Sequence, residues 1–299
     1  MGNSLGEVKK RISSTKSISQ ITKAMYMVSS SKIKKAEKIY SNYKDFMSRV
    51  EEMVSNVASL TDENYVHPLL EKRTVNKTAY LVITSDKGLA GAYNSTIYKI
   101  LDDIVNANHT TKESFLCASI GKKGFAHILK RGYPSINDHS ISIKDDVMFI
   151  DIDSLAGSII EMYLTRKIDK LVIIYNHFVN SITYETKVEE ILPIKQINKN
   201  ESKIDYEYEG GPVKILDMLL PIYVKDMIYG IILDAKSSEH SARMNAMRNA
   251  TDNANEVIDK LQLLYNRARQ NVITNELIDI IGGANAIGGE NWWMVMFMK

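Results

Sequence analysis

The chain has 299 residues, of which 44% are hydrophobic and 25% are charged, and it carries a formal net charge of +2. These ordinary globular values predict one or two domains with a buried core, and the small net charge indicates neither an acidic nor a basic partner. The single cysteine, Cys117, excludes a disulfide within the chain and a metal cluster held by thiolates.

The first predicted element is a long helix within residues 1–66. Ser4 and Glu7 have the spacing of a capping box, and neither glycine nor proline occurs from Glu7 to His67. Apolar residues recur at alternating spacings of three and four, which predicts a coiled-coil seam. The predicted seam contains Ile18, Ile21, Met25 and Val28, slips by one residue, and continues through Ile33, Ala36, Tyr40, Tyr43, Met47, Val50, Val54 and Val57.

The first half of this helix is basic. Ten lysine and arginine residues lie from Lys9 to Lys44, against the single acid Glu37. The pattern fits either a solvated helix face or a surface that meets an acidic partner. Because the N-terminus lacks a hydrophobic signal core and its register continues into the long helix, we expect it to be mature structure.

The middle of the chain, residues 75–195, is predicted to form an α/β domain with a Rossmann-like, mostly parallel sheet. Apolar runs with β-branched residues alternate there with glycine turns and helical patterns, which is typical of repeated strand–helix units. The predicted strands are 78–84, 114–120 and 169–179, with an edge strand at 182–193, and the predicted helices are 95–105, 125–132 and 154–167.

A second long helix is predicted over residues 212–287. Pro212 and Pro221 suit first turns of helices. Residues 231–281 contain neither glycine nor proline, which allows a helix of roughly 75 Å. Its predicted seam is Met247, Ala250, Ala254, Val257, Leu261, Leu264 and Ala268, after which the apolar stripe moves to Ile273, Leu277 and Ile281.

Since both ends of the chain carry such a seam, we predict that they pair as an antiparallel coiled coil. Each helix buries only one stripe in such a pair. The other faces, which carry Met25, Met27, Ile273 and Ile278, then need either solvent or a surrounding partner.

Neither glycine turn of the α/β domain carries a ligand-binding motif. The turn 85–94, SDKGLAGAYN, contains Gly88 and Gly91 but lacks both GxGxxG and the phosphate-loop sequence. The sequence GKKG at 121–124 has the GxxG pattern of KH domains, but it follows a strand instead of joining two helices. We interpret the first as a tight turn that requires small residues, and the second as a weak match in the wrong structural context.

Catalytic and metal-binding patterns are also missing from the sequence. None of the six histidines stands in a metal-ligand spacing, and we expect His240 to pack or lie at the surface. The acidic pairs Asp145-Asp146 and Asp151/Asp153 lie in what reads as a loop and a strand start, without a second ligand group. The sequence therefore predicts no catalytic residue, no cofactor site and no metal site.

Four long stretches together resemble one known family. Residues 18–37 and 241–287 are similar to the terminal helices of the γ subunit of rotary F-type ATP synthase. Residues 81–94 resemble the first strand and turn of that subunit, and 219–244 resemble the start of its C-terminal helix. The resemblance covers nearly the whole chain in the right order, although residues 100–210 match mainly in pattern.

The resemblance implies a non-catalytic rotor shaft. In this family the paired helices turn inside a ring of three α and three β subunits, while the α/β domain lies beside the ε subunit and the membrane c-ring. Mg-ATP and ADP are bound by the α and β subunits, so this chain is expected to hold no cofactor of its own. The resemblance implies attachment to the cytoplasmic face of the cell membrane as a peripheral subunit.

The resemblance also implies a set of contacts between the shaft and the ring. Arg269 and Gln270 match a contact with a loop of the β subunit, where a guanidinium can meet carboxylates. Thr274 and Glu276 match neighbouring positions, and Lys23 and Met25 match the opposite helix. The predicted rotor–stator contacts are Lys23, Met25, Arg269, Gln270, Thr274 and Glu276.

Two features depart from the family pattern. The family usually ends near Ile287, whereas this chain continues with an atypical apolar tail, 288–299. A cysteine-bearing regulatory insertion of the chloroplast type is missing, which favours a bacterial enzyme. The apolar run of the tail is too short for a membrane span, so we expect no transmembrane segment.

Three other functions remain possible at the level of sequence. A coiled-coil tether of another assembly would have no effect on an ATPase. A small-ligand enzyme would turn over a substrate alone. A nucleic-acid binder would use the basic N-terminal helix and show steep salt dependence, but such proteins commonly carry more positive charge, so no nucleic-acid partner is expected.

Overall fold

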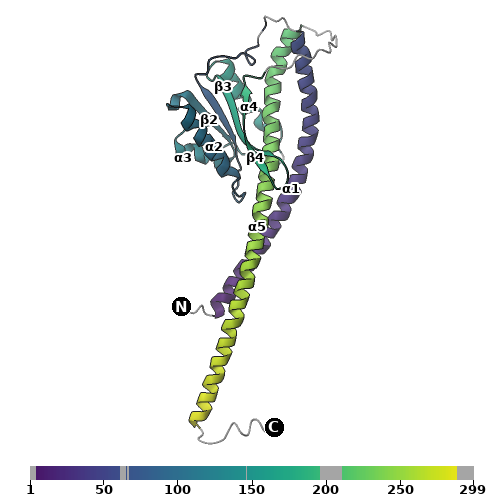
Figure 1. Ribbon diagram of the computed structural model, residues 1–299. Helices are drawn as coiled ribbons and strands as arrows, with labels where there is room; N and C mark the ends of the chain where they lie inside the picture. Colours follow the sequence, from purple (N-terminus) through teal and green to yellow (C-terminus); the bar gives the residue numbers. More distant parts are fainter. Residues whose placement is uncertain (1–4, 61–64, 66, 146, 196–210, 288–299) are drawn as a thin grey trace. The chain divides into compact units, whose positions relative to one another are not determined.

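The computed structural model describes residues 5–60, 65, 67–145, 147–195 and 211–287. Ser4 of the predicted capping box and the tail 288–299 lie outside these residues. The elements, in chain order, are α1 (Leu5–Ser59), β1 (Thr78–Ile83), α2 (Tyr93–Asn108), a short 3-10 helix (Lys112–Ser114), β2 (Phe115–Ile120), α3 (Lys122–Arg131), α4 (Ile150–Leu164), β3 (Lys170–Phe178), β4 (Tyr184–Leu192) and α5 (Pro212–Ile287) (Figure 1).

The four strands form one mixed sheet in the order β2-β1-β3-β4. β1 pairs in parallel with both β2 and β3, and β4 runs antiparallel to β3 at the edge. This confirms the predicted α/β fold with a mostly parallel sheet and an edge strand after the third strand.

The central strand β1 is buried on both faces, which explains its uninterrupted apolar sequence. On one face Leu81 and Ile83 pack with residues of α1, α4 and α5. On the other face Tyr80 and Val82 pack with residues of α2 and α3. The sheet is therefore a middle layer between two sets of helices.

By their contacts the residues form two compact units, one of residues 1–25 with 248–299 and one of residues 26–247. The boundary crosses both long helices, and each unit is described by itself. The sequence-based division into 1–66, 75–195, 212–287 and 288–299 stays a prediction.

In the smaller unit, the N-terminal part of α1 lies against α5. Thr22 Oγ1 and Thr251 Oγ1 are 2.7 Å apart, and Ser19 Oγ donates to Asn255 Oδ1 over 2.8 Å. The residue number falls on one helix as it rises on the other, so the pair is antiparallel, as predicted.

The predicted seam of α1 is correct from Ile33 onward, but of the four residues predicted before it only Met25 is half-buried. Ile18, Ile21 and Val28 are 51%, 60% and 54% exposed. A different series of buried and half-buried residues keeps spacings of four and three without a slip: Val8, Ile12, Thr15, Ser19, Thr22, Tyr26, Ser29 and Ile33.

Hydroxyl groups explain this difference. The Thr22 hydroxyl donates to the Ile18 carbonyl of its own helix over 3.0 Å, and Thr15 bonds Arg11 in the same way. Side chains satisfied by their own backbone can lie in a helix interface, and their small size lets the helices approach. A seam followed by hydropathy alone therefore takes the wrong register.

The seam of α5 shows a smaller error of the same kind. Met247, Ala250, Ala254, Leu261 and Ala268 are buried or half-buried, as predicted, but Val257 and Leu264 are exposed. The residues that follow these two exposed ones, Ile258 and Tyr265, are half-buried in their place.

The predicted positions of Pro221 and of the pair Asp151/Asp153 are also wrong. Pro212 begins α5 as expected, but Pro221 lies inside the helix. Proline has no N–H group, so the carbonyl of Asp217 receives no hydrogen bond from position 221. Because Asp217 is exposed, a water molecule can donate to that carbonyl instead. Asp151 and Asp153 lie in the first turn of α4, not in a loop and a strand start.

Candidate functional site

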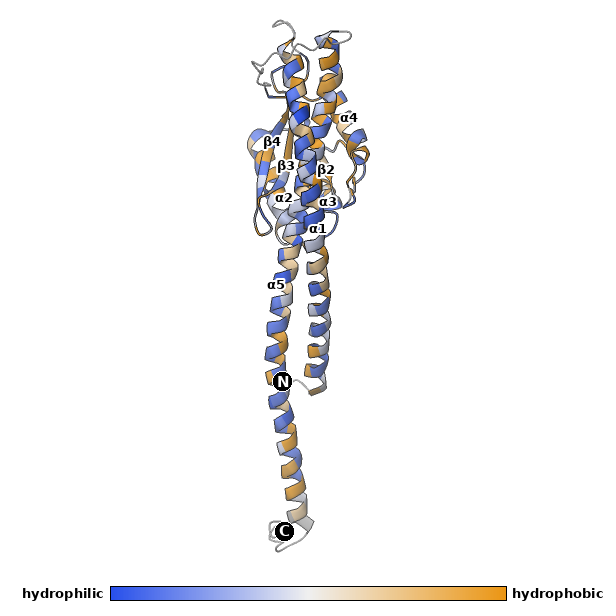
Figure 2. Cartoon of the chain, turned by 90° about the vertical axis from the view of Figure 1, so that its right-hand side faces the viewer, coloured by the Kyte–Doolittle hydropathy of each residue, from blue (hydrophilic) through white to orange (hydrophobic). Residues whose placement is uncertain are grey.

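The last part of α5 has no helix beside it among the described residues of the smaller unit. Because Thr22 lies against Thr251 and Ser19 against Asn255, the antiparallel register places Leu5, where α1 begins, at the level of about residue 269. All residues from 269 to 284 are exposed. Figure 2 shows this part of α5 as a single helix beyond the start of α1, with several of its turns in the orange of hydrophobic residues.

These exposed apolar residues surround much of the helix. They are Val272, Ile273, Leu277, Ile278, Ile280 and Ile281, and their exposed fractions run from 43% to 68%. At 3.6 residues per turn they spread over roughly 240° of the circumference. A single groove covers one stripe of a helix, so a partner that covers all six must enclose this segment.

Within the larger unit, α5 covers the end of the sheet where ligands usually bind. In open α/β sheets that place is the crevice at the carboxyl ends of the strands, here between β1 and β3. Tyr93 Oη donates to the Ala235 carbonyl over 3.0 Å. Asp234 lies 2.6 Å from His177 Nδ1 and accepts the amide of Phe178 at 2.9 Å, so α5 is bonded directly to the end of β3.

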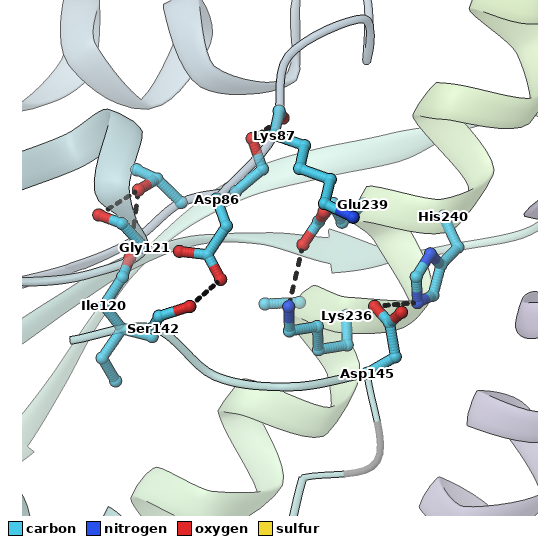
Figure 3. Close-up of polar contacts among 12 residues, drawn as sticks. Asp86, Lys87, Ile120, Gly121, Ser142, Asp145, Lys236, Glu239 and His240 are labelled. Carbon is cyan, nitrogen blue, oxygen red and sulfur yellow. Dashed lines mark hydrogen bonds and ion pairs between the residues drawn. The ribbon is translucent and has the colours of Figure 1, made fainter. Parts of the chain in front are cut away.

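The N-terminus of α3, at the same end of the sheet, is occupied by a side chain of the protein. A helix N-terminus is a common site for phosphate, but at α3 the amide of Lys122 donates to the Asp86 carboxylate over 3.0 Å. Asp86 also accepts the Ser142 hydroxyl at 2.6 Å, as Figure 3 shows. The chain thus supplies its own anion here, which agrees with the missing nucleotide-binding motif.

The glycine turns serve close packing. Gly121 has a φ of 96°, and a Cβ there would lie 2.1 Å from the Thr84 carbonyl oxygen. A Cβ on Gly124 would lie 2.4 Å from Ser119 Oγ. GKKG therefore lies where β2 passes into α3 close to the end of β1, so it follows a strand, as the sequence predicted, and does not join two helices.

The acidic residues considered for metal binding have partners within the protein. Asp151 accepts the amide of Met148 at 2.9 Å, and Asp153 lies 2.7 Å from Lys225 Nζ. Asp145 lies 2.5 Å from Lys32 Nζ, while Asp146 lies outside the described residues. Among the residues described, no group of three or more His, Cys, Asp or Glu side chains could hold a metal ion.

Cys117 is a structural residue. It lies buried in β2, and burial, together with the charge of Asp102, raises the pKa of its thiol to about 12. The thiolate that metal binding or nucleophilic attack requires is therefore not formed at neutral pH.

Comparisons with known proteins decide the family. Residues 4–287 match the ATP synthase family. A chain in the central stalk and c-ring structure of the Tetrahymena thermophila mitochondrial ATP synthase is 26% identical, with a TM-score of 0.60, over 77% of this chain and 99% of that one. The chain belongs to the γ-subunit family of ATP synthase.

Two chains of the Euglena gracilis mitochondrial ATP synthase share the fold. One is 17% identical over 98% of this chain and 100% of its own, with a TM-score of 0.66. The other, from the rotor, is 18% identical over 91% and 100%, with a TM-score of 0.57. As a γ-family chain, the protein is a central-stalk subunit of ATP synthase. No helix in its described part is long and apolar enough to cross a membrane.

The six residues predicted to contact the ring fall into two groups on this γ subunit. Arg269, Gln270, Thr274 and Glu276 lie on the single-helix end of α5, all exposed, and their side chains make no hydrogen bond or ion pair with a described residue. Lys23, exposed, and Met25, half-buried, lie on α1 next to the Thr22–Thr251 contact. Thr251 precedes Arg269 by 18 residues, or roughly 27 Å of helix.

Thus the structure brings the four α5 residues together and does not place Lys23 and Met25 opposite them. The contact roles of all six stay predictions. The sequence reading missed a third group, the charged residues of α5 between Lys236 and Arg243, which are buried against the sheet edge.

Proposed function

We propose that this chain is the rotating shaft that couples ion flow through the membrane rotor to nucleotide cycling in the β subunits. The observation that carries the proposal is the single-helix end of α5, whose apolar side chains need an enclosing partner. A ring of α and β subunits provides such an enclosure. A shaft biases the states of the β subunits only by contacting them unequally as it turns.

The chemistry belongs, in this proposal, to the partners. The α and β subunits bind Mg-ATP and ADP, and this chain holds no cofactor and has no active site. This assignment is supported by the sheet edge, where α5 and Asp86 occupy the places that a nucleotide would use. We further propose that the ε subunit and the c-ring bind the α/β domain, at the cytoplasmic face of the membrane. A bacterial origin stays a prediction.

The function is tested by Mg-ATP hydrolysis with purified α and β subunits, with and without this chain. We expect the chain alone to be inert, to assemble with the two subunits and to raise steady turnover. A chain that joins the ring without changing the rate would instead act as a tether.

Arg269 tests the contact with the ring. Replacing Arg269 by Ala should lower the steady turnover of the assembled complex by about tenfold, because a charge-assisted hydrogen bond to a partner is lost. The free chain should keep its stability, since Arg269 is exposed and its side chain makes no hydrogen bond or ion pair with a described residue. Lys260→Ala is the matched control, because Lys260 is an exposed cation of the same helix that pairs with Glu256 at 2.6 Å. Equal turnover in both variants would refute the Arg269 contact.

A further inference from the structure

One face of α5 carries three charged side chains that are buried at the sheet edge. Glu239 accepts from Lys236 Nζ at 3.2 Å through one carboxylate oxygen and from Arg243 Nη2 at 2.8 Å through the other. The side chains of Lys236, Glu239 and Arg243 are only 9%, 6% and 11% exposed. We call these three residues the ion ladder; Figure 3 shows its Lys236–Glu239 contact.

The ion ladder joins α5 to the loop after β1. Arg243 Nη2 donates to the Lys87 carbonyl over 3.3 Å as well as to Glu239. The guanidinium is thus oriented by Glu239 on its own helix while it bonds a different element. Without the carboxylate, two buried cations would repel each other and Arg243 would lose the group that orients it.

A second contact joins the same part of α5 to α1. His240 Nε2 lies 3.4 Å from Asp145 Oδ1 (Figure 3). The other carboxylate oxygen of Asp145, Oδ2, lies 2.5 Å from Lys32 Nζ of α1. Burial alone would raise the pKa of Asp145, but Lys32, His240 and Lys236 together hold it below its ordinary value. Asp145 therefore keeps its negative charge between Lys32 of α1 and Lys236 of the ion ladder.

Between Lys236 and Arg243, the other buried residues of α5 are small, with the exception of His240. Ser237, Ser238, Ser241 and Ala242 are all at most 6% exposed. The larger apolar side chains of α5 that pack in the core, such as Ile232 and Leu233, precede this segment. Small residues let the helix approach the sheet closely but offer no large side chain that would interlock with it. In this segment, resistance to sliding or turning of the helix must then come mainly from directional polar contacts.

We propose that the ion ladder is the torsional anchor between α5 and the α/β domain, with Glu239 as its positioning residue. The anchor transmits torque applied to the α/β domain into α5 without slippage. This inference rests on the proposed function as a rotating shaft.

The test uses the complete membrane-bound ATP synthase that contains this chain, and it measures ATP hydrolysis and ATP-driven ion pumping in vesicles. Glu239→Gln keeps the shape and removes the charge. We expect the ratio of ions pumped to ATP hydrolysed to fall to less than about half, since losing a charged, buried hydrogen-bond acceptor shifts the balance between anchored and released helix by about tenfold or more.

Glu190→Gln is the matched control. Glu190 on β4 also pairs with a lysine of the α/β domain, Lys170 on β3, at 2.6 Å. This ion pair does not involve α5. We expect this variant to pump like the wild type. If wild-type complexes themselves fail to couple, the proposed function fails; if wild type and Glu239→Gln couple equally, only the anchor fails.

A disulfide distinguishes slippage from general damage. A Cβ on Gly91 would lie 3.9 Å from Ala246 Cβ, which is within the range of disulfide geometry. Gly91→Cys with Ala246→Cys therefore links the loop after β1 to α5 at a second point, and the one natural cysteine is buried. Because Gly91 has a φ of 57°, a cysteine there is strained, so the same cysteine pair with Glu239 intact is the reference for the pumping ratio.

In the Glu239→Gln background, oxidation of this pair should restore the pumping ratio, and reduction should abolish it again. If the Glu239→Gln variant assembles poorly, oxidation of the cysteine pair should restore its assembly into the complex. The anchor would be overturned if the disulfide forms but does not restore the pumping ratio. For a variant that had lost assembly, the corresponding result is a disulfide that forms without restoring assembly.

Discussion

Asp226 carries a carboxyl group that the fold buries without a partner among the described residues. It is 6% exposed, and burial raises its pKa to about 6. The pKa of Asp226 is higher in the folded chain than in the unfolded chain. The contribution of Asp226 to the free energy of unfolding is therefore most favourable below about pH 4, and it is lost as the pH rises through about 6. Asp226→Asn should therefore stabilise the chain by about 1–2 kcal/mol at pH 7.5 and have little effect near pH 4.

Urea unfolding at the two pH values measures this difference. Asp45→Asn, an exposed carboxyl on α1, is the control and should show no pH-dependent gain. Equal stabilisation of Asp226→Asn at both pH values would contradict an ionised, buried Asp226.

The residue scale is also where the sequence was least informative. Lys236, Glu239 and Arg243 are spaced like charges on a solvated helix face, and nothing in their order shows that a sheet covers them. Burial of a charge depends on partners that are distant in the sequence, such as Lys87. Asp86 is a similar case, since its role at the start of α3 depends on the meeting of two loops.

At the scale of elements, a close contact between α1 and α5 depends on Gly230. A Cβ there would lie 2.3 Å from Tyr43 Cε1, and the Tyr43 hydroxyl is held by the Asp226 carbonyl, so the ring cannot move aside easily. Gly230→Ala should destabilise the chain by about 2 kcal/mol, although alanine is the better helix former. Thermal unfolding measures the change.

Gly157 in α4 provides the comparison. The nearest atoms to a Cβ there belong to the flexible Lys225 side chain, at 3.9 Å. Gly157→Ala should raise stability by about 0.5–1 kcal/mol through helix propensity. If both alanine variants stabilise the chain, the Gly230–Tyr43 contact does not limit the packing of the two helices.

The elements themselves were largely predictable because buried strands need apolar runs and helix ends need particular residues. All four strands were expected within two residues of their observed bounds. The coiled-coil register failed before Ile33 because Thr15, Ser19 and Thr22 fill the seam. No hydropathy scale marks a hydroxyl that is satisfied by its own helix, as in Thr15 and Thr22, or by the partner helix, as in Ser19.

At the scale of the whole molecule, the segment that stabilises the fold and the segment proposed for function are separate. Residues 269–284 are exposed, and their apolar side chains have no cover within the described chain. Neither the packing of the sheet nor the seam up to Ala268 depends on them. Such a segment is retained for a partner and not for folding.

Truncation separates the two roles. A chain that ends at Ala268 should unfold at the same temperature as the full chain, within about 1 °C, because exposed residues without partners contribute little to stability. It should fail to raise ATP turnover with α and β subunits. A chain that ends at Ile287 shows which effects belong to residues 288–299 alone. A lower unfolding temperature for the Ala268 chain, but not for the Ile287 chain, would mean that 269–287 stabilises the fold, and the argument for an enclosing ring would lose its basis.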